Sequence, residues 1–173
     1  MRTYFLIFCC LFFAATVHAE QNCKPDSIPA STPDSQLLDN GDGTVTDSKT
    51  NLIWKKCLEG VEGDNCETGS ASTFTWQEAL QQPEVINNAG GFAGYTGWRL
   101  PNIRELVSIV EEQCNYPAIN MNRFSNTPSS DVWSGSPSAY GSDYAWYVAF
   151  NDGYYSIKFR NNGSAVRLVR GGQ

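Results

Sequence analysis

The stretch that decides the fold class covers residues 144–160 and reads "YAWYVAFNDGYYSIKFR". Its two halves, 144–150 and 154–160, are rich in aromatic and β-branched residues and alternate in the manner of half-buried strands. The "NDG" between them is a turn signal, because Asn, Asp and Gly tolerate the backbone angles that tight turns need. We therefore predict a β-hairpin here. The side chains expected to face the core are Trp146, Val148, Phe150, Tyr155, Ile157 and Phe159.

The next residues extend this hairpin by one more strand. A second turn signal, "NNG" at 161–163, is followed by "SAVRLVR" at 164–170, in which Val166 and Leu168 are expected to point inward. Two consecutive hairpins make a three-stranded antiparallel meander. Asp131–Ser134 is a candidate for a further strand before it.

A second hairpin is predicted near the N-terminus, where residues 39–54 read "DNGDGTVTDSKTNLIW". An EF-hand loop fails, because the alignment that fits its glycine puts Leu38 and Lys49 at the two most important ligand positions. Turns at 40–43 and 47–51 between strands 44–46 and 52–54 fit better. We expect no metal ion, although a calcium site of another type remains open, formed by Asp39, Asp42 and Asp47.

Two helices are predicted between the hairpins. Thr75 with Glu78 forms a capping box, so one helix should begin at Trp76, and Pro83 should break or kink it after about two turns. A second capping pattern begins at Asn102. It is followed by an apolar stripe at helical spacing, made of Ile103, Leu106, Val107 and Val110. Strands at both ends with helices between them predict an α+β domain.

The first nineteen residues read as a secretory signal peptide, with Arg2 before an apolar run and a small-residue cleavage signal at 17–19. That run is too short to span a membrane. Without this segment the formal charge changes from −6 to −7, which disfavours nucleic acid and anionic membranes as partners. The one histidine, His18, also leaves, which excludes Ser-His-Asp triads and HExxH zinc sites. We expect no cofactor.

Four cysteines remain in the exported chain, and they predict two disulfides. Cys57 and Cys66 flank a short polar stretch that closes easily into a loop. Cys23 is then expected to pair with Cys114, at the end of the second helix. The Pro- and Ser-rich residues 20–36 are interpreted as an extended N-terminal arm pinned at Cys23, and residues 37–173 as a single domain.

Several separate stretches occur together here in an order typical of one family: "TWQEAL", "GWRLPNIREL", "YPAINMNRF", "VWSGSP", "SDYAWYVAFNDG" and "VRLVRGG". The chain resembles, over residues 37–172, the bacterial domain of unknown function typified by the C-terminal domain of the collagen-like adhesin of Legionella. The resemblance implies a fold like that of C-type lectins. It also implies a role in binding, since that adhesin binds sulfated glycosaminoglycans. The collagen repeats of the adhesin are absent from this chain.

Nine aromatic residues lie between Asp131 and Arg160, and those with polar tips stand beside amide and acid side chains in the turns. Core packing is the default interpretation. The alternative is a surface for a glycan or a protein, because rigid rings and short amides bind at little entropic cost. The candidate ligand-binding residues are Tyr140, Tyr144, Asn151, Asp152, Tyr154, Asn161 and Asn162.

A second candidate site is basic. Lys158 and Arg160 are expected on one strand face with Arg167 on the neighbouring strand, where they form either a solvated sheet face or a site for sulfate or carboxylate groups.

The resulting hypothesis is an exported, non-enzymatic binding or adhesion module located in the periplasm, outside the cell or on its surface. One alternative is an enzyme related to formylglycine-generating proteins, because "WRLPN" resembles a motif of that group. The other alternative is a purely structural protein of the cell envelope. The sequence leaves the ligand and the oligomeric state open.

Overall fold

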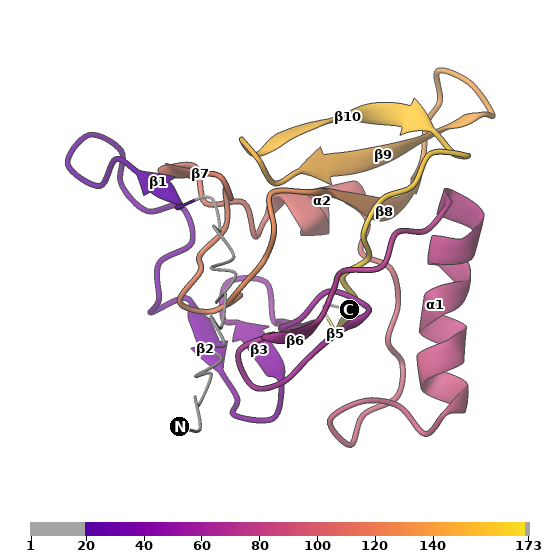
Figure 1. Ribbon diagram of the computed structural model, residues 1–173, viewed down its shortest axis with the longest axis horizontal. Coiled ribbons are helices and arrows are strands. Elements are labelled where there is room, and N and C mark those ends of the chain that lie inside the picture. The colour runs from indigo at the N-terminus through magenta and orange to yellow at the C-terminus, as the bar shows by residue number, and fades with distance from the viewer. Residues whose placement is uncertain (1–19, 172–173) are drawn as a thin grey trace, which may run out of the picture.

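The computed structural model describes residues 20–171 (Figure 1), so the expected signal peptide lies outside the described residues. It shows an α+β protein in which two helices accompany several antiparallel sheets. The elements follow one another as β1 (Asn22–Cys23), β2 (Leu37–Asp39), β3 (Thr44–Asp47), β4 (Leu52–Lys55), β5 (Val61–Glu62), β6 (Thr68–Gly69), α1 (Trp76–Asn88), α2 (Ile103–Val107), β7 (Cys114–Asn115), β8 (Asp131–Pro137), β9 (Tyr144–Ala149), β10 (Tyr154–Phe159) and β11 (Val169–Gly171). No helix among residues 20–171 is long and apolar enough to cross a membrane.

The predicted N-terminal hairpin is confirmed as β3 and β4, which belong to a four-stranded sheet in the order β11-β4-β3-β2. Val45 pairs with Trp54 across the hairpin, and both side chains are fully buried. β2 and β11 pair with the outer sides of this hairpin. The four-stranded sheet is therefore built from strands at both ends of the described chain.

The three aspartates of this hairpin hold its turns. Asp39 accepts a hydrogen bond from the amide of Gly41, Asp42 from the amide of Thr44, and Asp47 from the amide of Lys49. Bonds of this kind let an aspartate substitute for backbone groups in a turn. The carboxylates thus hold the turns of the hairpin, and Asp39 also forms an ion pair with Lys56 at 2.6 Å.

The C-terminal meander exists, but it consists of β8, β9 and β10 in a three-stranded sheet, and the prediction of its third strand was wrong. Residues 164–170 do not pair with β10. Ala165 instead forms a parallel bridge with Val132 of β8, and Val169 pairs with Trp54 of β4. The physical reason is burial, because every residue from 164 to 169 is buried. The segment therefore passes between the two sheets instead of lying at an edge.

Part of the predicted core was also wrong. Val148 and Phe150 are fully buried, but Tyr155 is 51% exposed and Phe159 is 53% exposed. The cause is the position of β10. α2 packs against β8 and β9, whereas β10 is the outermost strand of its sheet (Figure 1). Trp146 of β9 is half-buried.

α1 begins at Trp76 with the predicted capping box between Thr75 and Glu78, which confirms its start. The predicted break at Pro83 did not occur, and the helix continues to Asn88. Ala79 and Ile86, on either side of the proline, pack on the same apolar cluster. Packing both halves of the helix on this cluster stabilises α1 by more than the loss of the one backbone hydrogen bond that proline removes.

The capping box at the start of α2 is also confirmed, with Asn102 and Glu105 exchanging hydrogen bonds. α2 has only five residues, however, and Cys114 lies in β7 instead of at a helix end. Glu105 also forms a bidentate ion pair with Arg99, with both N–O distances at 2.7 Å. This ion pair fixes α2 to the segment before it, which contains Arg99.

Disulfides link Cys23 to Cys114 and Cys57 to Cys66, which is the pairing expected from the sequence. Residues 20–36 lie along the rest of the fold. Their main anchor is Glu111, whose carboxylate accepts hydrogen bonds from the amides of Ser31 and Thr32, at 2.9 Å each. Burial alone would raise the pKa of Glu111, but these hydrogen bonds outweigh it and hold the pKa below its ordinary value.

Candidate functional site

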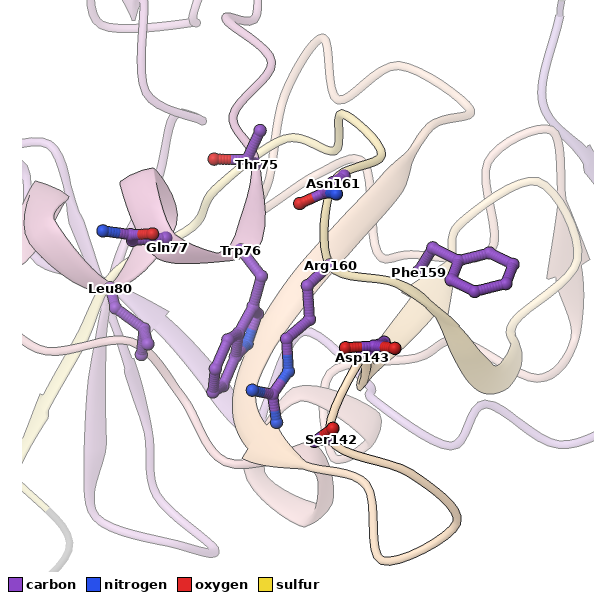
Figure 2. A pocket seen from close by; sticks show the side chains of 9 residues that line it. All are labelled: Thr75, Trp76, Gln77, Leu80, Ser142, Asp143, Phe159, Arg160 and Asn161. Atoms are coloured by element: carbon purple, nitrogen blue, oxygen red, sulfur yellow. The ribbon is translucent and has the colours of Figure 1, made fainter.

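A cleft of about 620 Å³ lies between the start of α1 and one end of the three-stranded sheet (Figure 2). Residues from α1, from the loop before β9 and from the end of β10 line it. These residues are Thr75, Trp76, Gln77, Leu80, Ser142, Asp143, Phe159, Arg160 and Asn161. The lining mixes aromatic rings, amides, a hydroxyl pair, an acid and a guanidinium group.

Backbone hydrogen bonds tie the walls of this cleft together. The amide of Trp76 donates to the carbonyl of Arg160 at 2.8 Å, and the amide of Arg160 donates to the carbonyl of Asp143 at 2.8 Å. The first residue of α1, the end of β10 and the loop before β9 are thereby fixed relative to one another. A site held by such contacts is preorganised for a ligand.

Arg160 is the principal charged group of the cleft. Its guanidinium carbon lies 4.2 Å from the centroid of the Trp76 ring, which is a cation–π contact, and its Nε donates to the carbonyl of Tyr144 at 3.1 Å. Trp76 is held in turn by a 2.8 Å hydrogen bond from its Nε1 to the carbonyl of Ser134. Within residues 20–171, the two terminal nitrogens of Arg160 form no hydrogen bond or ion pair, so they are available to an acceptor outside the protein.

Three aromatic side chains form a rim at this end of the sheet, with the ring of Phe159 turned away from Trp76 and Arg160 (Figure 2). The rings of Phe159 and Tyr144 lie 4.5 Å apart, and that of Tyr140 lies 5.7 Å from Tyr144. Tyr140 is 82% exposed and Phe159 is more than half exposed. Exposed rings in a row, with a polar cleft next to them, can contact the apolar faces of a sugar or the side chains of a protein.

The seven predicted ligand residues do not form one surface, which corrects the prediction. Tyr140, Tyr144, Asn161 and Asn162 lie at the cleft end of the sheet, whereas Asn151, Asp152 and Tyr154 lie at the opposite end. The pairings of Tyr154 with Ala149 and of Phe159 with Tyr144 fix these ends. A six-residue strand separates them by roughly 17 Å. Turn composition alone cannot distinguish the two ends of a hairpin sheet.

The predicted basic face does not form either. Arg167 is fully buried, so it shares no surface with Lys158 and Arg160. Its NH1 donates to the carbonyl of Lys55 at 3.0 Å, and burial lowers the pKa of Arg167 to about 9 despite the opposing charge of Glu59. Lys158 is paired with Asp131 at 2.8 Å. Of the three predicted cations, only Arg160 lines the cleft.

Sequence patterns did not identify five of the nine residues that line the cleft. Trp76, Gln77 and Leu80 were predicted only as part of a helix, and no role was predicted for Ser142 and Asp143. Trp76 contacts Arg160, which lies more than eighty residues later in the chain. Only the capping box at Thr75 placed a helix start in this part of the chain, and it carried no information about what that start faces.

Among residues 20–171, no group of three His, Cys, Asp or Glu side chains is arranged to hold a metal ion.

A comparison with protein families gives one match, to the family described as the Lcl C-terminal domain, over residues 43–170. No curated protein matches the chain. The match includes every strand from β3 to β10, both helices and all of the residues that line the cleft.

Proposed function

Because the chain belongs to the family of Lcl C-terminal domains, we propose that it is an exported, non-enzymatic binding or adhesion module with a C-type-lectin-like fold. Its domain is residues 37–173, preceded by the signal peptide and the arm at 20–36. The two disulfides support export, since such bonds persist in oxidising compartments. The module acts in the periplasm, outside the cell or on its surface.

The ligand of this module is a glycan that carries an anionic group, or a protein surface with the same chemistry, and it binds in the cleft of Figure 2. The observation that carries this proposal is Arg160. A guanidinium held against Trp76, with two terminal nitrogens that have no partner in the described chain, is suited to a bidentate contact with a carboxylate or sulfate.

Neighbouring groups in the cleft supply the remaining contacts. Asn161 and Gln77 offer amide donors and acceptors for hydroxyl groups, and the exposed ring of Phe159 offers an apolar face. The resemblance to the Legionella adhesin, which binds sulfated glycosaminoglycans, points to the same chemistry. The negative formal charge of the chain favours recognition of a single anionic group over tight binding of a dense polyanion.

A formylglycine-type enzyme is not favoured, because all four cysteines of residues 20–171 are in disulfides and that chemistry requires reactive thiols. Titration of the folded protein with a thiol reagent should find no reactive thiol. Two free thiols per chain would support the enzyme instead.

An array of glycans and glycosaminoglycans, probed with and without calcium, tests the binding proposal. Arg160→Ala should lower binding at least about tenfold, and Arg160→Lys should restore little of it, because an ammonium cannot make the bidentate contact. Arg104→Ala is the matched control, since Arg104 is an exposed arginine on α2 outside the cleft. Full binding by Arg160→Ala would contradict the proposal, and a protein that binds nothing on the array or on host proteins would favour a structural role.

A further inference from the structure

The outer edge of β10 is an unused hydrogen-bonding surface. In the part of the chain described, residues 154–158 make no backbone hydrogen bond to any segment other than β9. Figure 1 shows β10 as the outermost strand on its side of the molecule. The pairing of β10 with β9 is regular over all six residues, so no bulge turns this edge away.

The register identifies which backbone groups point outward. The amide of Phe150 donates to the carbonyl of Ser130, so the even-numbered residues of β9 hydrogen-bond to β8. In an antiparallel sheet these positions alternate, so the odd-numbered residues of β9 bond to the even-numbered residues of β10. The outward N–H and C=O groups of β10 therefore belong to Tyr155, Ile157 and Phe159. The Phe159 carbonyl already accepts a hydrogen bond from the amide of Asn162 at 3.0 Å, and the other outward groups have no backbone partner within residues 20–171.

Most of the usual protections of an edge strand are missing here; the inward-turned charge of Lys158 is the exception, and an ion pair neutralises it. β10 contains no proline, and its one charged side chain, Lys158, is turned inward, where it binds Asp131 at 2.8 Å and lies over the ring of Tyr147. The exposed side chains on the strand are aromatic, with Tyr154 60% exposed as well as Tyr155 and Phe159. Such an edge is suited to pairing with another strand.

We propose that this edge pairs with the β10 edge of a second copy of the chain, in antiparallel orientation, with Ile157 opposite Ile157 on the two-fold axis. In this register the outward groups of one copy meet those of the other. Tyr155 lies opposite Phe159 of the second copy, so aromatic residues meet aromatic residues on one face. On the other face Lys158 lies opposite Ser156 of the second copy, so no like charges are opposed. The result is a continuous six-stranded sheet.

This register also supplies charge complementarity at both ends of the paired strands. Continued past the end of β10, it places Tyr154 of the second copy opposite Arg160, next to the 151–153 turn of the second copy, which carries Asp152. The two separated groups of predicted ligand residues thereby come together, one group from each copy. The part of the inference that concerns the cleft rests on the proposed function, whereas the dimer itself does not.

Sedimentation of the purified exported protein without ligand tests the dimer, over concentrations from about 1 μM to 1 mM. The wild-type mass should approach twice that of one chain as concentration rises. Ile157→Pro removes only an outward N–H, so it should leave the hairpin folded and raise the dissociation constant more than about tenfold. Ile157→Lys would place two like charges opposite each other on the two-fold axis and should also weaken the dimer. Its control is Val85→Lys, which adds the same charge on the exposed side of α1.

Cysteine crosslinking tests the register. Residues in a hydrogen-bonded antiparallel pair have Cα atoms about 5.5 Å apart, which a disulfide can bridge. Ile157→Cys should therefore form a covalent dimer under mild oxidation, whereas Ser156→Cys, on the other face and out of register, should not. A wild-type protein that stays monomeric at about 1 mM, or equal crosslinking of both variants, would overturn the proposal. Because neither assay contains ligand, a failure of the proposed glycan site leaves these results unaffected.

Discussion

Two arginines only seven positions apart show how differently the two sheets use the same side chain. Arg167, beside the four-stranded sheet, is fully buried, and its guanidinium donates to the carbonyl of Lys55 and, at 2.8 Å, to Thr127. Arg160, at the end of the three-stranded sheet, is half-buried and leaves its terminal nitrogens without a partner in the described chain. One side chain completes the interior, and the other is available to a ligand.

This contrast between the two arginines separates residues that stabilise the fold from residues that are available to a ligand. A buried polar group must be satisfied within the protein, or folding is penalised by its desolvation. A group at a cleft can stay unsatisfied, because water solvates it until a ligand replaces the water. Asp47 of the β3–β4 hairpin belongs to the first kind, since it is fully buried and accepts a hydrogen bond from the amide of Lys49. The aromatic rim and Arg160 belong to the second kind.

The largest effect on stability should come from the disulfide that anchors the N-terminal arm. Cys23 and Cys114 are 91 positions apart, so replacing both by serine should cost roughly 4.6 kcal/mol in the loop-entropy model. The bridge between Cys57 and Cys66 spans 9 positions and should cost only roughly 2.7 kcal/mol. Urea denaturation of the two double mutants compares them, and equal losses would show that loop length does not determine the effect.

The second test compares two phenylalanines. Phe150 is fully buried, so Phe150→Ala should lower the free energy of unfolding by about 4 kcal/mol. Phe159 is more than half exposed on the edge strand, so Phe159→Ala should cost less than about 1 kcal/mol. Urea denaturation measures both changes. Comparable losses would mean that Phe159 belongs to the core after all.

The third test compares the two arginines directly. Arg167→Met should cost about 3 kcal/mol, because it leaves two backbone carbonyls and the Thr127 hydroxyl without their donor in the interior. Arg160→Met should cost less than about 1 kcal/mol, since only the carbonyl of Tyr144 loses a donor. Thermal unfolding at neutral pH reads out both variants. A reversal of the order would invalidate the assignment of interior and surface roles.

The fourth test uses pH on the anchor of the N-terminal arm. The pKa of Glu111 is held below its ordinary value, so its charge stabilises the folded state at neutral pH and this contribution is lost as pH falls through the folded-state pKa. Glu111→Gln should cost about 2 kcal/mol at pH 7. The difference from wild type should shrink steadily in acid below about pH 4. A difference that is independent of pH would show that the charge of Glu111 is not the stabilising feature.

Local signals in the sequence predicted the parts of the fold that local physics determines. The capping boxes at Thr75 and Asn102, the turns of the β3–β4 hairpin and the "NDG" turn after β9 are short-range patterns, and all are present. The errors concern long-range packing. Nothing local shows that residues 164–169 pass through the interior, or that β10 lies at an edge where alternate aromatic residues stay exposed.

The candidate site shows the same limit. Asn161 was predicted as a ligand residue from composition, because loops with aromatic and amide side chains are recognisable in a sequence, and it lines the cleft. Trp76 was not predicted to belong to the site, because its place there depends on its backbone hydrogen bond to Arg160, a residue far away in the sequence. A single sequence also cannot separate the two ends of one sheet, so Asn151, Asp152 and Tyr154 were grouped with residues at the opposite end.

The most direct test of the central claim is the affinity of Arg160→Ala for an anionic glycan identified on the array, measured by titration calorimetry beside wild type and Arg104→Ala. If the cleft is the ligand site, wild type and Arg104→Ala should bind alike, and Arg160→Ala should bind at least about tenfold more weakly, a loss of about 1.4 kcal/mol, while unfolding at an unchanged temperature. Equal affinities for all three proteins would contradict the claim, because the cleft beside Trp76 would then not be the ligand site.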